Sequence, residues 1–237
     1  MTAHGAATAI DGQSEEGILY HITHDVRACL RAIKTIPEWV QDDLTGEGIE
    51  LPEPTRELFD MLAIQVARAD RLLLDLRDYD RIGRMSDPMS WNDLEEVIQA
   101  GRQIAELPDG FTLDVELRAP RVFGSRNDMQ SLFASLISNA VRHHHLDRGT
   151  IRIVSRPMPD GVLMRVRDDG PGIPPEFREK VFDLLSTLKS RDECDTSGVG
   201  LAKARRILAR TGGSIQLIDR PGRGGSTFEL FFPNPQG

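Results

Sequence analysis

This 237-residue sequence has few cysteines, few aromatic residues and no long apolar run. The two cysteines, Cys29 and Cys194, lack the close spacing of zinc ligands and offer no disulfide framework. No stretch of about 18 apolar residues occurs, and residues 1–17 lack the basic and apolar regions of a signal peptide. We therefore expect a chain that stays in the reducing cytoplasm and does not insert directly into a membrane.

The sequence also lacks the excess of basic residues that nucleic-acid binding requires. It has 29 Lys and Arg against 37 Asp and Glu, which gives a formal net charge of −8. Because neutralising nucleic-acid phosphates needs clustered positive charge, we expect no nucleic-acid partner. The apolar fraction is 39%, and with glycine added it is typical of a globular protein, which excludes a wholly disordered chain.

Residues 18–85 carry a helical pattern. Two segments repeat apolar residues every three or four positions, and the glycine- and proline-rich residues 46–54 separate them. We expect a helical hairpin, in which Pro37 is either a tolerated kink or a signalling hinge. Because one helical pair buries too little apolar surface to be stable alone, a homodimer that forms a four-helix bundle is expected.

The pattern changes after the hairpin and divides the chain into parts. Residues 1–17 have no periodicity and are expected to be a disordered lead-in. Residues 18–85 form the hairpin and residues 86–90 a linker. Residues 91–237 mix helical and strand patterns, which indicates an α/β sandwich, so the fold class of the whole chain is α+β.

Individual elements of the second domain follow from their patterns. Asn92 with Glu95 resembles a capping box that opens a helix ending at Gln103. Alternating apolar residues predict strands, and apolar residues three or four apart predict helices. The expected strands are residues 111–117, 150–156, 162–168, 214–219 and 226–232, and the expected further helices are residues 127–143 and 199–211.

The segment from Val166 to Ile173 carries a candidate binding motif. Its strand ends in carboxylates, and Gly170 and Gly172 follow Asp168. Glycine lets a backbone approach a flat ligand closely, and a part-buried carboxylate can accept a hydrogen bond from an exocyclic amine such as that of adenine. By itself, the motif fits an ordinary turn equally well.

A second glycine motif, Ser-Gly-Val-Gly-Leu at residues 197–201, stands directly before an expected helix. Free amides at a helix N-terminus can bind phosphate, although the motif lacks the Lys-Ser/Thr pair of a P-loop. In the preceding helix, Asn139 offers an amide oxygen suited to Mg²⁺, and Arg142 can meet a phosphate. By themselves, these two side chains would form a solvated helix face.

Taken in order, these motifs resemble a two-component sensor histidine kinase, whose ATP-binding domain is of the type shared with DNA gyrase and mismatch-repair ATPases. The resemblance runs from about Leu19 to Pro233 and implies ATP and Mg²⁺ as cofactors. Asn139 is similar to the family's magnesium-binding asparagine, with Arg142 and His143 in its phosphate-facing positions. The further residues that the resemblance assigns to nucleotide binding are Asp168, Gly170, Gly172, Ile173, Phe182, Lys189, Arg191, Ser197, Gly198, Val199, Gly200, Leu201 and Thr227.

Several of these positions take their role from the resemblance alone. Phe182 is similar to the phenylalanine of a family motif, and Lys189 and Arg191 fall in the segment that would be the flexible ATP lid. Thr227 falls where the family has a small hydroxyl residue behind the adenine-binding carboxylate, here Asp168.

The resemblance also implies a function for the hairpin. Residues 23–27, Thr-His-Asp-Val-Arg, are similar to the family's phospho-acceptor motif. His24 is therefore expected to accept the phosphoryl group and Asp25 to take the proton, while Arg142 neutralises charge. His21 is the nearby competitor, but no acid follows it. The expected partner is a response-regulator receiver domain, and the stimulus would come from a separate sensor chain or from a sensor domain missing from this sequence.

Some positions depart from the family pattern. Cys29 stands where many relatives have proline, Ser135 replaces an asparagine, and Thr196 replaces a glycine. These departures leave open a non-catalytic phosphotransfer or scaffold protein with a decayed ATP domain, and an ATPase clamp like gyrase is a third possibility. Ala28, four residues after His24, lacks the polar group with which relatives orient water, so weak phosphatase activity is expected.

Overall fold

The chain, seen here as a computed structural model, divides into two compact units, Met1–Asp78 and Tyr79–Gly237. Each unit is described by itself. Side chains are described from Thr23 onward, except that of His24. The structure describes residues 11–83, 87–188, 196–218 and 224–235.

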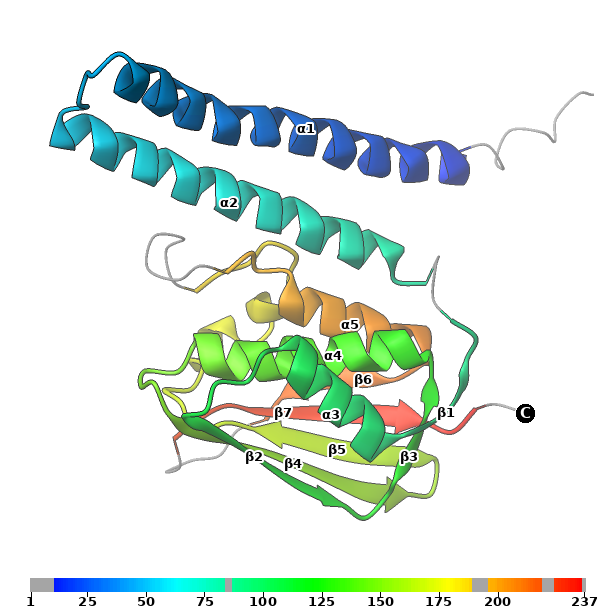
Figure 1. Cartoon of the computed structure of the whole chain (residues 1–237). Helices are drawn as coiled ribbons and strands as arrows, with labels where there is room; N and C mark the ends of the chain where they lie inside the picture. The colour runs from blue at the N-terminus through cyan, green and yellow to red at the C-terminus, as the bar shows by residue number, and fades with distance from the viewer. Residues whose placement is uncertain (1–10, 84–86, 189–195, 219–223, 236–237) are drawn as a thin grey trace, which may run out of the picture. The chain divides into compact units, whose positions relative to one another are not determined.

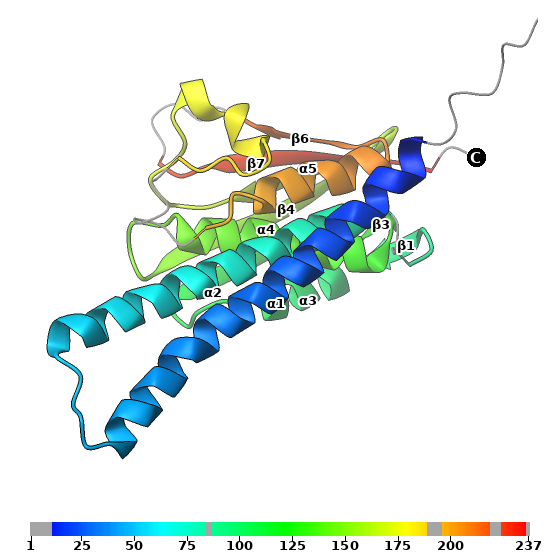
Figure 2. The ribbon, with the colours of Figure 1, turned by 90° about the horizontal axis from the view of Figure 1, so that it is seen from above.

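The first unit is the expected helical hairpin (Figure 2). Helix α1 spans Asp11–Gly46 and continues through Pro37, and helix α2 spans Glu53–Arg81. An ion pair joins the two helices, with Arg27 Nε 2.6 Å from Asp70 Oδ1. Helix α1 begins earlier than expected, since residues 11–17 are helical and not a disordered lead-in. Acidic residues occur in this first part of the helix, where negative charge favours a helix N-terminus.

Apolar side chains of the hairpin remain exposed in the single chain. Trp39 is 63% exposed on α1, and on α2 Leu58 is 61% and Met61 58% exposed. One hairpin therefore cannot bury all the apolar side chains of these two helices. This is why a bundle of more than two helices is expected.

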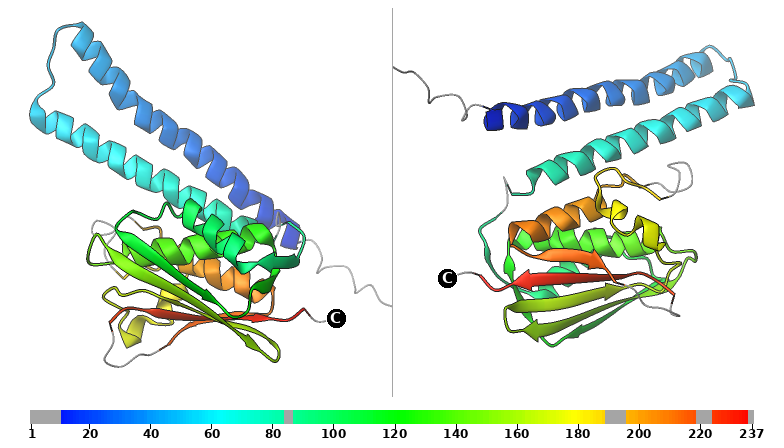
Figure 3. Two further views of the ribbon diagram at one scale, coloured as in Figure 1. Left: turned by 60° about the horizontal axis from the view of Figure 1, so that its bottom comes forward. Right: turned by 180° about the vertical axis from the view of Figure 1, so that it is seen from behind.

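The second unit is a mixed sheet with helices on one face (Figures 1 and 3). The strand order is β2-β4-β5-β7-β6, in which only the β2–β4 pair is parallel. A separate antiparallel pair joins β1 to β3. The strands are β1 (Ser90–Asp93), β2 (Phe111–Leu117), β3 (Arg121–Gly124), β4 (Gly149–Met158), β5 (Gly161–Arg167), β6 (Ser214–Leu217) and β7 (Thr227–Pro233); the helices are α3 (Leu94–Ile104), α4 (Arg126–Arg142) and α5 (Gly200–Arg210), with short 3-10 turns at Pro175–Phe177 and Lys180–Phe182.

The core of this unit lies between the sheet and its helices. Alternate strand residues such as Ile153, Met164 and Leu230 are fully buried, and they pack with Leu132 and Leu208 from α4 and α5. The intervening strand residues lie on the other face, which is rich in polar side chains. This period of two is what the sequence predicted for the strands, and the expected α+β fold is confirmed.

The N-terminus of α3 corrects one expectation. The N-cap is Asp93, whose carboxylate accepts from the backbone N–H of Glu95 at 2.9 Å, and not Asn92. Asn92 is buried, and its amide donates to the carbonyl oxygens of Ser90 and Gly124, at 2.9 and 2.8 Å. Both residues can cap a helix, but only Asn92 can donate two hydrogen bonds, which brace the β1–β3 pair.

The boundary between the units also differs from the expected linker at residues 86–90. The second unit begins at Tyr79, inside the last turns of α2. Ile82 is buried in the core of that unit, and the Arg206 guanidinium lies 4.6 Å from the centre of the Tyr79 ring. The end of α2 therefore belongs to the core of the second unit, and this long-range contact is not revealed by a local pattern.

Candidate functional site

Asp168 follows β5 and is 7% exposed. Its Oδ1 accepts hydrogen bonds from the backbone N–H groups of Gly170 and Ser226, both at 3.0 Å. Its own N–H donates to the Ser226 carbonyl oxygen at 3.1 Å. Oδ2 makes no hydrogen bond within the part of the chain that the structure describes. The backbone thus fixes one oxygen, and the other can accept a hydrogen bond from a ligand amine.

Glycines allow the backbone to close around this carboxylate. A Cβ on Gly170 would lie 3.0 Å from Asp168 Oδ1, and one on Gly225 would overlap the Asp168 carbonyl oxygen. Gly172 and Gly225 also have positive φ angles, +81° and +89°, which side chains disfavour. The spacing of Gly170 and Gly172 after Asp168 therefore has a structural cause.

Helix α4 brings the expected magnesium and phosphate ligands to its C-terminal end. Asn139 is half-buried, and its amide makes no hydrogen bond to any residue that the structure describes. Arg142 is exposed in the last turn, and His143 is the half-buried C-cap. An uncommitted amide beside an exposed guanidinium fits the binding of a cation and a phosphate.

His144 links the end of α4 to the Asp168 loop. Its Nε2 lies 3.2 Å from Asp169 Oδ1, which also accepts from the Thr150 N–H at 2.8 Å. Burial favours the neutral Asp169 carboxyl, but hydrogen bonds from backbone N–H groups and from His144 outweigh it and hold its pKa below the usual value. The ionised Asp169 therefore ties α4 and β4 to the loop that carries Asp168.

The second glycine motif leads into α5. Gly198 has a φ of +70°, its carbonyl oxygen accepts from the Leu185 N–H at 3.0 Å, and a Cβ there would lie 2.6 Å from the Ser186 carbonyl oxygen. A Cβ on Gly200 would lie 3.8 Å from the Ser135 side chain, so α5 starts against α4. Ser197 and Leu201 flank this turn. The N-cap is Val199, which supplies no side-chain hydrogen bond to the helix terminus, so its N–H groups can face a phosphate.

Three other expected site residues are buried or half-buried in the second unit. Ile173 is half-buried against the core. Phe182 is buried and contacts Phe228 edge to face, with ring centres 6.2 Å apart. Thr227 is buried at the start of β7 and lines the sheet face opposite the helices, while its neighbour Ser226 contacts Asp168. Successive residues of a strand point to opposite faces of the sheet, so Thr227 faces away from the helices when Phe228 faces toward them.

The remaining expected residues are only partly visible. Lys189 and Arg191 lie outside the described residues. The backbone of His24 lies in α1, and Asp25 next to it is exposed, as is Ala28 one turn later. Two further residues were not expected to be important, because their partners are distant in the sequence. The Asp87 carboxylate accepts from backbone N–H groups at the start of α4, and the Ser226 backbone N–H donates to Asp168.

The described residues contain no group of three or more His, Cys, Asp or Glu side chains that could hold a metal ion. Over the same residues, none of the helices is both long and apolar enough to cross a membrane.

Residues 124–236 match the family described as histidine kinase-, DNA gyrase B-, and HSP90-like ATPase. The chain is 31% identical over 229 residues to the methanogenesis regulatory histidine kinase FilI of Methanothrix harundinacea (strain 6Ac), a match covering 93% of this chain and 25% of FilI. This chain spans only 24% to 28% of the length of several curated relatives that it matches.

Solved structures share the fold. Full-length ShkA in complex with AMPPNP is 20% identical with a TM-score of 0.64, covering 93% of this chain and 47% of ShkA. The histidine kinase ThkA in complex with the response regulator TrrA is 22% identical with a TM-score of 0.60, covering 94% of this chain and 64% of ThkA. These likenesses of sequence and fold identify the chain as related to two-component sensor histidine kinases, with an ATPase domain of the histidine kinase, DNA gyrase B and HSP90 type.

Proposed function

We propose that this chain is a histidine protein kinase that transfers the γ-phosphoryl group of ATP to His24 and then to an aspartate of a response-regulator receiver domain. The observation that carries the proposal is the geometry of Asp168. One carboxylate oxygen is held by two backbone N–H groups and the other is available, in a domain of an ATPase family. That arrangement fits an acceptor for the exocyclic amine of adenine.

The phosphate end of the nucleotide would meet α4 and the start of α5. Arg142 supplies positive charge, and the N–H groups of the first turn of α5 supply hydrogen bonds. The half-buried amide of Asn139 fits Mg²⁺, which when bound beside the phosphates would neutralise part of their charge. The protein's contribution is mainly positioning and charge neutralisation, because phosphoryl transfer asks for little covalent chemistry.

In the transfer itself, an imidazole nitrogen of His24 forms a bond to the γ-phosphorus while the bond from that phosphorus to the bridging oxygen breaks and ADP leaves. The proton of the imidazole goes to a base, and the exposed carboxylate of Asp25 is the adjacent candidate. A homodimer would complete the bundle around α1 and α2. The ThkA structure with its response regulator supports a receiver domain as the next acceptor.

One observation favours the alternative of a non-catalytic phosphotransfer or scaffold protein. Ser135 stands where the family has an asparagine, and its hydroxyl donates to the Ser131 carbonyl oxygen at 2.8 Å within α4. The Ser135 hydroxyl is thus occupied by the helix backbone. Asn139 would then be the one amide side chain left in the motif to bind Mg²⁺.

Incubation with γ-labelled ATP and Mg²⁺ separates the two functions. We expect acid-labile label on the chain, its complete loss in His24→Ala, and its retention in His21→Ala, which removes an imidazole one turn away. A chain that binds ATP but accepts no label would favour the scaffold, and label that persists in His24→Ala would contradict the assignment of the acceptor.

A further inference from the structure

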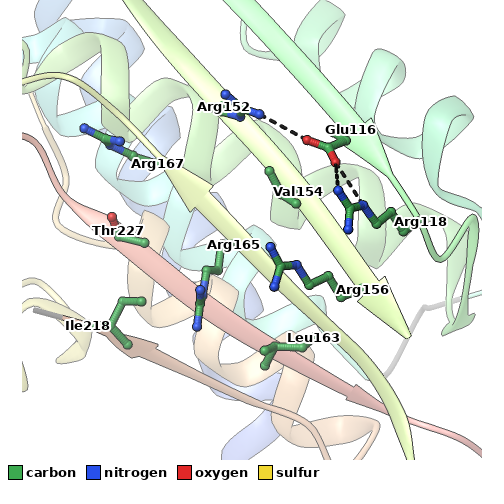
Figure 4. Close-up of a pocket in the computed structure, with 10 residues that line it drawn as sticks. All are labelled: Glu116, Arg118, Arg152, Val154, Arg156, Leu163, Arg165, Arg167, Ile218 and Thr227. Atoms are coloured by element: carbon green, nitrogen blue, oxygen red, sulfur yellow. Dashed lines mark hydrogen bonds and ion pairs between the residues drawn. The ribbon is translucent and has the colours of Figure 1, made fainter. Parts of the chain in front are cut away.

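The sheet of the second unit has a pocket on the face that the helices leave uncovered (Figure 4). It has a volume of about 690 Å³, which lies in the range of ligand-binding clefts. On β5, Val166 is buried in the core beneath the helices, whereas the next residue, Arg167, lines this opposite face. Its lining side chains are Glu116, Arg118, Arg152, Val154, Arg156, Leu163, Arg165, Arg167, Ile218 and Thr227.

The lining contains five arginines but few acids. Glu116 lies 2.8 Å from an Arg118 nitrogen and 3.0 Å from an Arg152 nitrogen, so one carboxylate serves two guanidinium groups. These contacts lower the pKa of Glu116 and keep it ionised. Arg165 pairs with Glu229 at 2.7 Å. The local charge is therefore positive, although the whole chain carries a net charge of −8.

Two of the arginines have no carboxylate of their own. The side chains of Arg156 and Arg167 make no ion pair or hydrogen bond with any residue in the described ranges. The sheet register also places Arg167 directly opposite Arg152 on the neighbouring strand. Like charges across a strand pair destabilise a sheet, so this arrangement does not serve folding, and an anion on the face would relieve it.

The spacing of these two arginines distinguishes between anions. Arg156 is opposite Leu163, and Arg167 follows Leu163 by four residues along β5. At about 3.3 Å per residue, the two positions are therefore about 13 Å apart along the strand. Val154, which is opposite Arg165, lies between these two positions, and Leu163 lies beside Arg156; both provide an apolar surface. A single phosphate group is too small to meet both ends, whereas an extended chain with acids four residues apart matches the spacing.

We propose that the arginine face, the pocket lined by these five arginines, binds an extended acidic segment of a partner protein. Carboxylates four residues apart in that segment would meet Arg156 and Arg167, and an apolar side chain between them would lie against Val154 and Leu163. Apart from Thr227, the lining shares no residue with the expected nucleotide site, and the proposal does not depend on kinase activity. Guanidinium groups suit this role because each can bind a carboxylate through two parallel hydrogen bonds.

A fluorescein-labelled peptide, Glu-Ser-Val-Ser-Glu-Ser-Val-Ser-Glu, tests the proposal in fluorescence anisotropy with the full chain, without nucleotide and at low salt. We expect saturable binding that weakens as salt is added, because exposed charges are screened. Replacing each Glu of the peptide by Gln should abolish binding. In the protein, Arg156→Gln and Arg167→Gln should each weaken binding about three- to tenfold, whereas Arg156→Lys should lose less.

Arg102→Gln is the matched control, since Arg102 is an exposed arginine on α3, in the helix layer. It should leave the affinity for the peptide within about twofold of the unmodified chain. Equal affinity in all three Gln variants would overturn the proposal. The proposal would also be overturned if the peptide did not bind while tripolyphosphate or phosphatidylglycerol vesicles bound and lost affinity in Arg156→Gln and Arg167→Gln. The face would then suit a compact anion or a lipid surface.

Discussion

The two oxygens of the Asp168 carboxylate differ in what they bind. Oδ1 accepts two backbone hydrogen bonds that close the loop between β5 and Gly170 and join it to the start of β7. Oδ2 is left for a ligand. A carboxylate can do both because it only accepts, whereas an amide of the same shape has one acceptor oxygen and one donor nitrogen.

Asp168→Asn tests this division. If the amide oxygen keeps the two backbone bonds, the amide nitrogen faces the ligand and cannot accept from the amine of adenine. We expect the Kd for ATP to rise about tenfold or more, corresponding to about 1.4 kcal/mol, and the preference for ATP over GTP to fall. Titration calorimetry with both nucleotides measures this. Asp160→Asn, on an exposed turn, is the control; an unchanged ATP preference in Asp168→Asn would contradict the assigned role.

At the scale of single residues, the sequence predicted the turn after Asp168, whose cause is local. The glycines after Asp168 are needed for the turn itself, so their spacing is visible in the sequence. The hydrogen bond from the Ser226 backbone N–H to the Asp168 carboxylate spans 58 residues. Every residue except proline has this donor, so the residue type at position 226 could not reveal the contact.

Helix α4 depends on a residue outside it. Ser125 is the N-cap and accepts from the Asp128 N–H at 3.2 Å. The Asp87 carboxylate then accepts from the Ser125 hydroxyl at 2.6 Å and from the N–H groups of Arg126 and Asn127, at 2.9 and 3.2 Å. Burial opposes ionisation of Asp87, but these hydrogen bonds hold its pKa below the usual value. A charge at a helix N-terminus is also favoured by the helix dipole.

Asp87→Asn should therefore destabilise the second unit in a pH-dependent way. A lowered pKa in the folded state means that the stabilisation is present above the unfolded-state pKa, about 3.9, and is lost as the pH falls through the folded-state pKa. We expect a loss of about 1 kcal/mol, or about 2–4 °C in Tm, at pH 7. The difference from the unmodified chain should shrink toward pH 3.

Thermal unfolding followed by circular dichroism at both pH values makes the measurement. Asp109→Asn, an exposed acid in the loop before β2, should behave like the unmodified chain at either pH. A deficit in Asp87→Asn that is as large at pH 3 as at pH 7 would show that the carboxylate does not act through its charge.

Elements were predictable where periodicity is regular. The expected strand 111–117 coincides with β2, and the expected helix 127–143 differs from α4 by one residue at each end. The cap of α3 was misplaced by one residue because Asn92 and Asp93 have the same local preference. The contacts of Asp87 and the arginine face were not predicted, since they arise only when strands and loops from distant parts of the sequence come together.

On the scale of the whole molecule, α2 contributes to both compact units. Most of it lies in the hairpin, and its last turns, with Tyr79 and Ile82, belong to the second unit. Arg206 on α5 contacts both of these residues, the Tyr79 ring at 4.6 Å and the Ile82 carbonyl oxygen at 3.5 Å. The boundary between the two units therefore lies within α2 and not at its end.

The hairpin is expected to form a homodimer, and Leu58→Gln tests this without disturbing the packing of a single chain. Leu58 is 61% exposed, so its replacement removes little contact within the monomer. In a symmetric dimer the substitution occurs twice, and losing about 1.5–3 kcal/mol per buried leucine should weaken association at least tenfold. Sedimentation velocity over a concentration series measures the dissociation constant. Glu57→Gln changes the neighbouring exposed position and should leave the dimer intact, whereas an unchanged dimer in Leu58→Gln would place the association surface elsewhere.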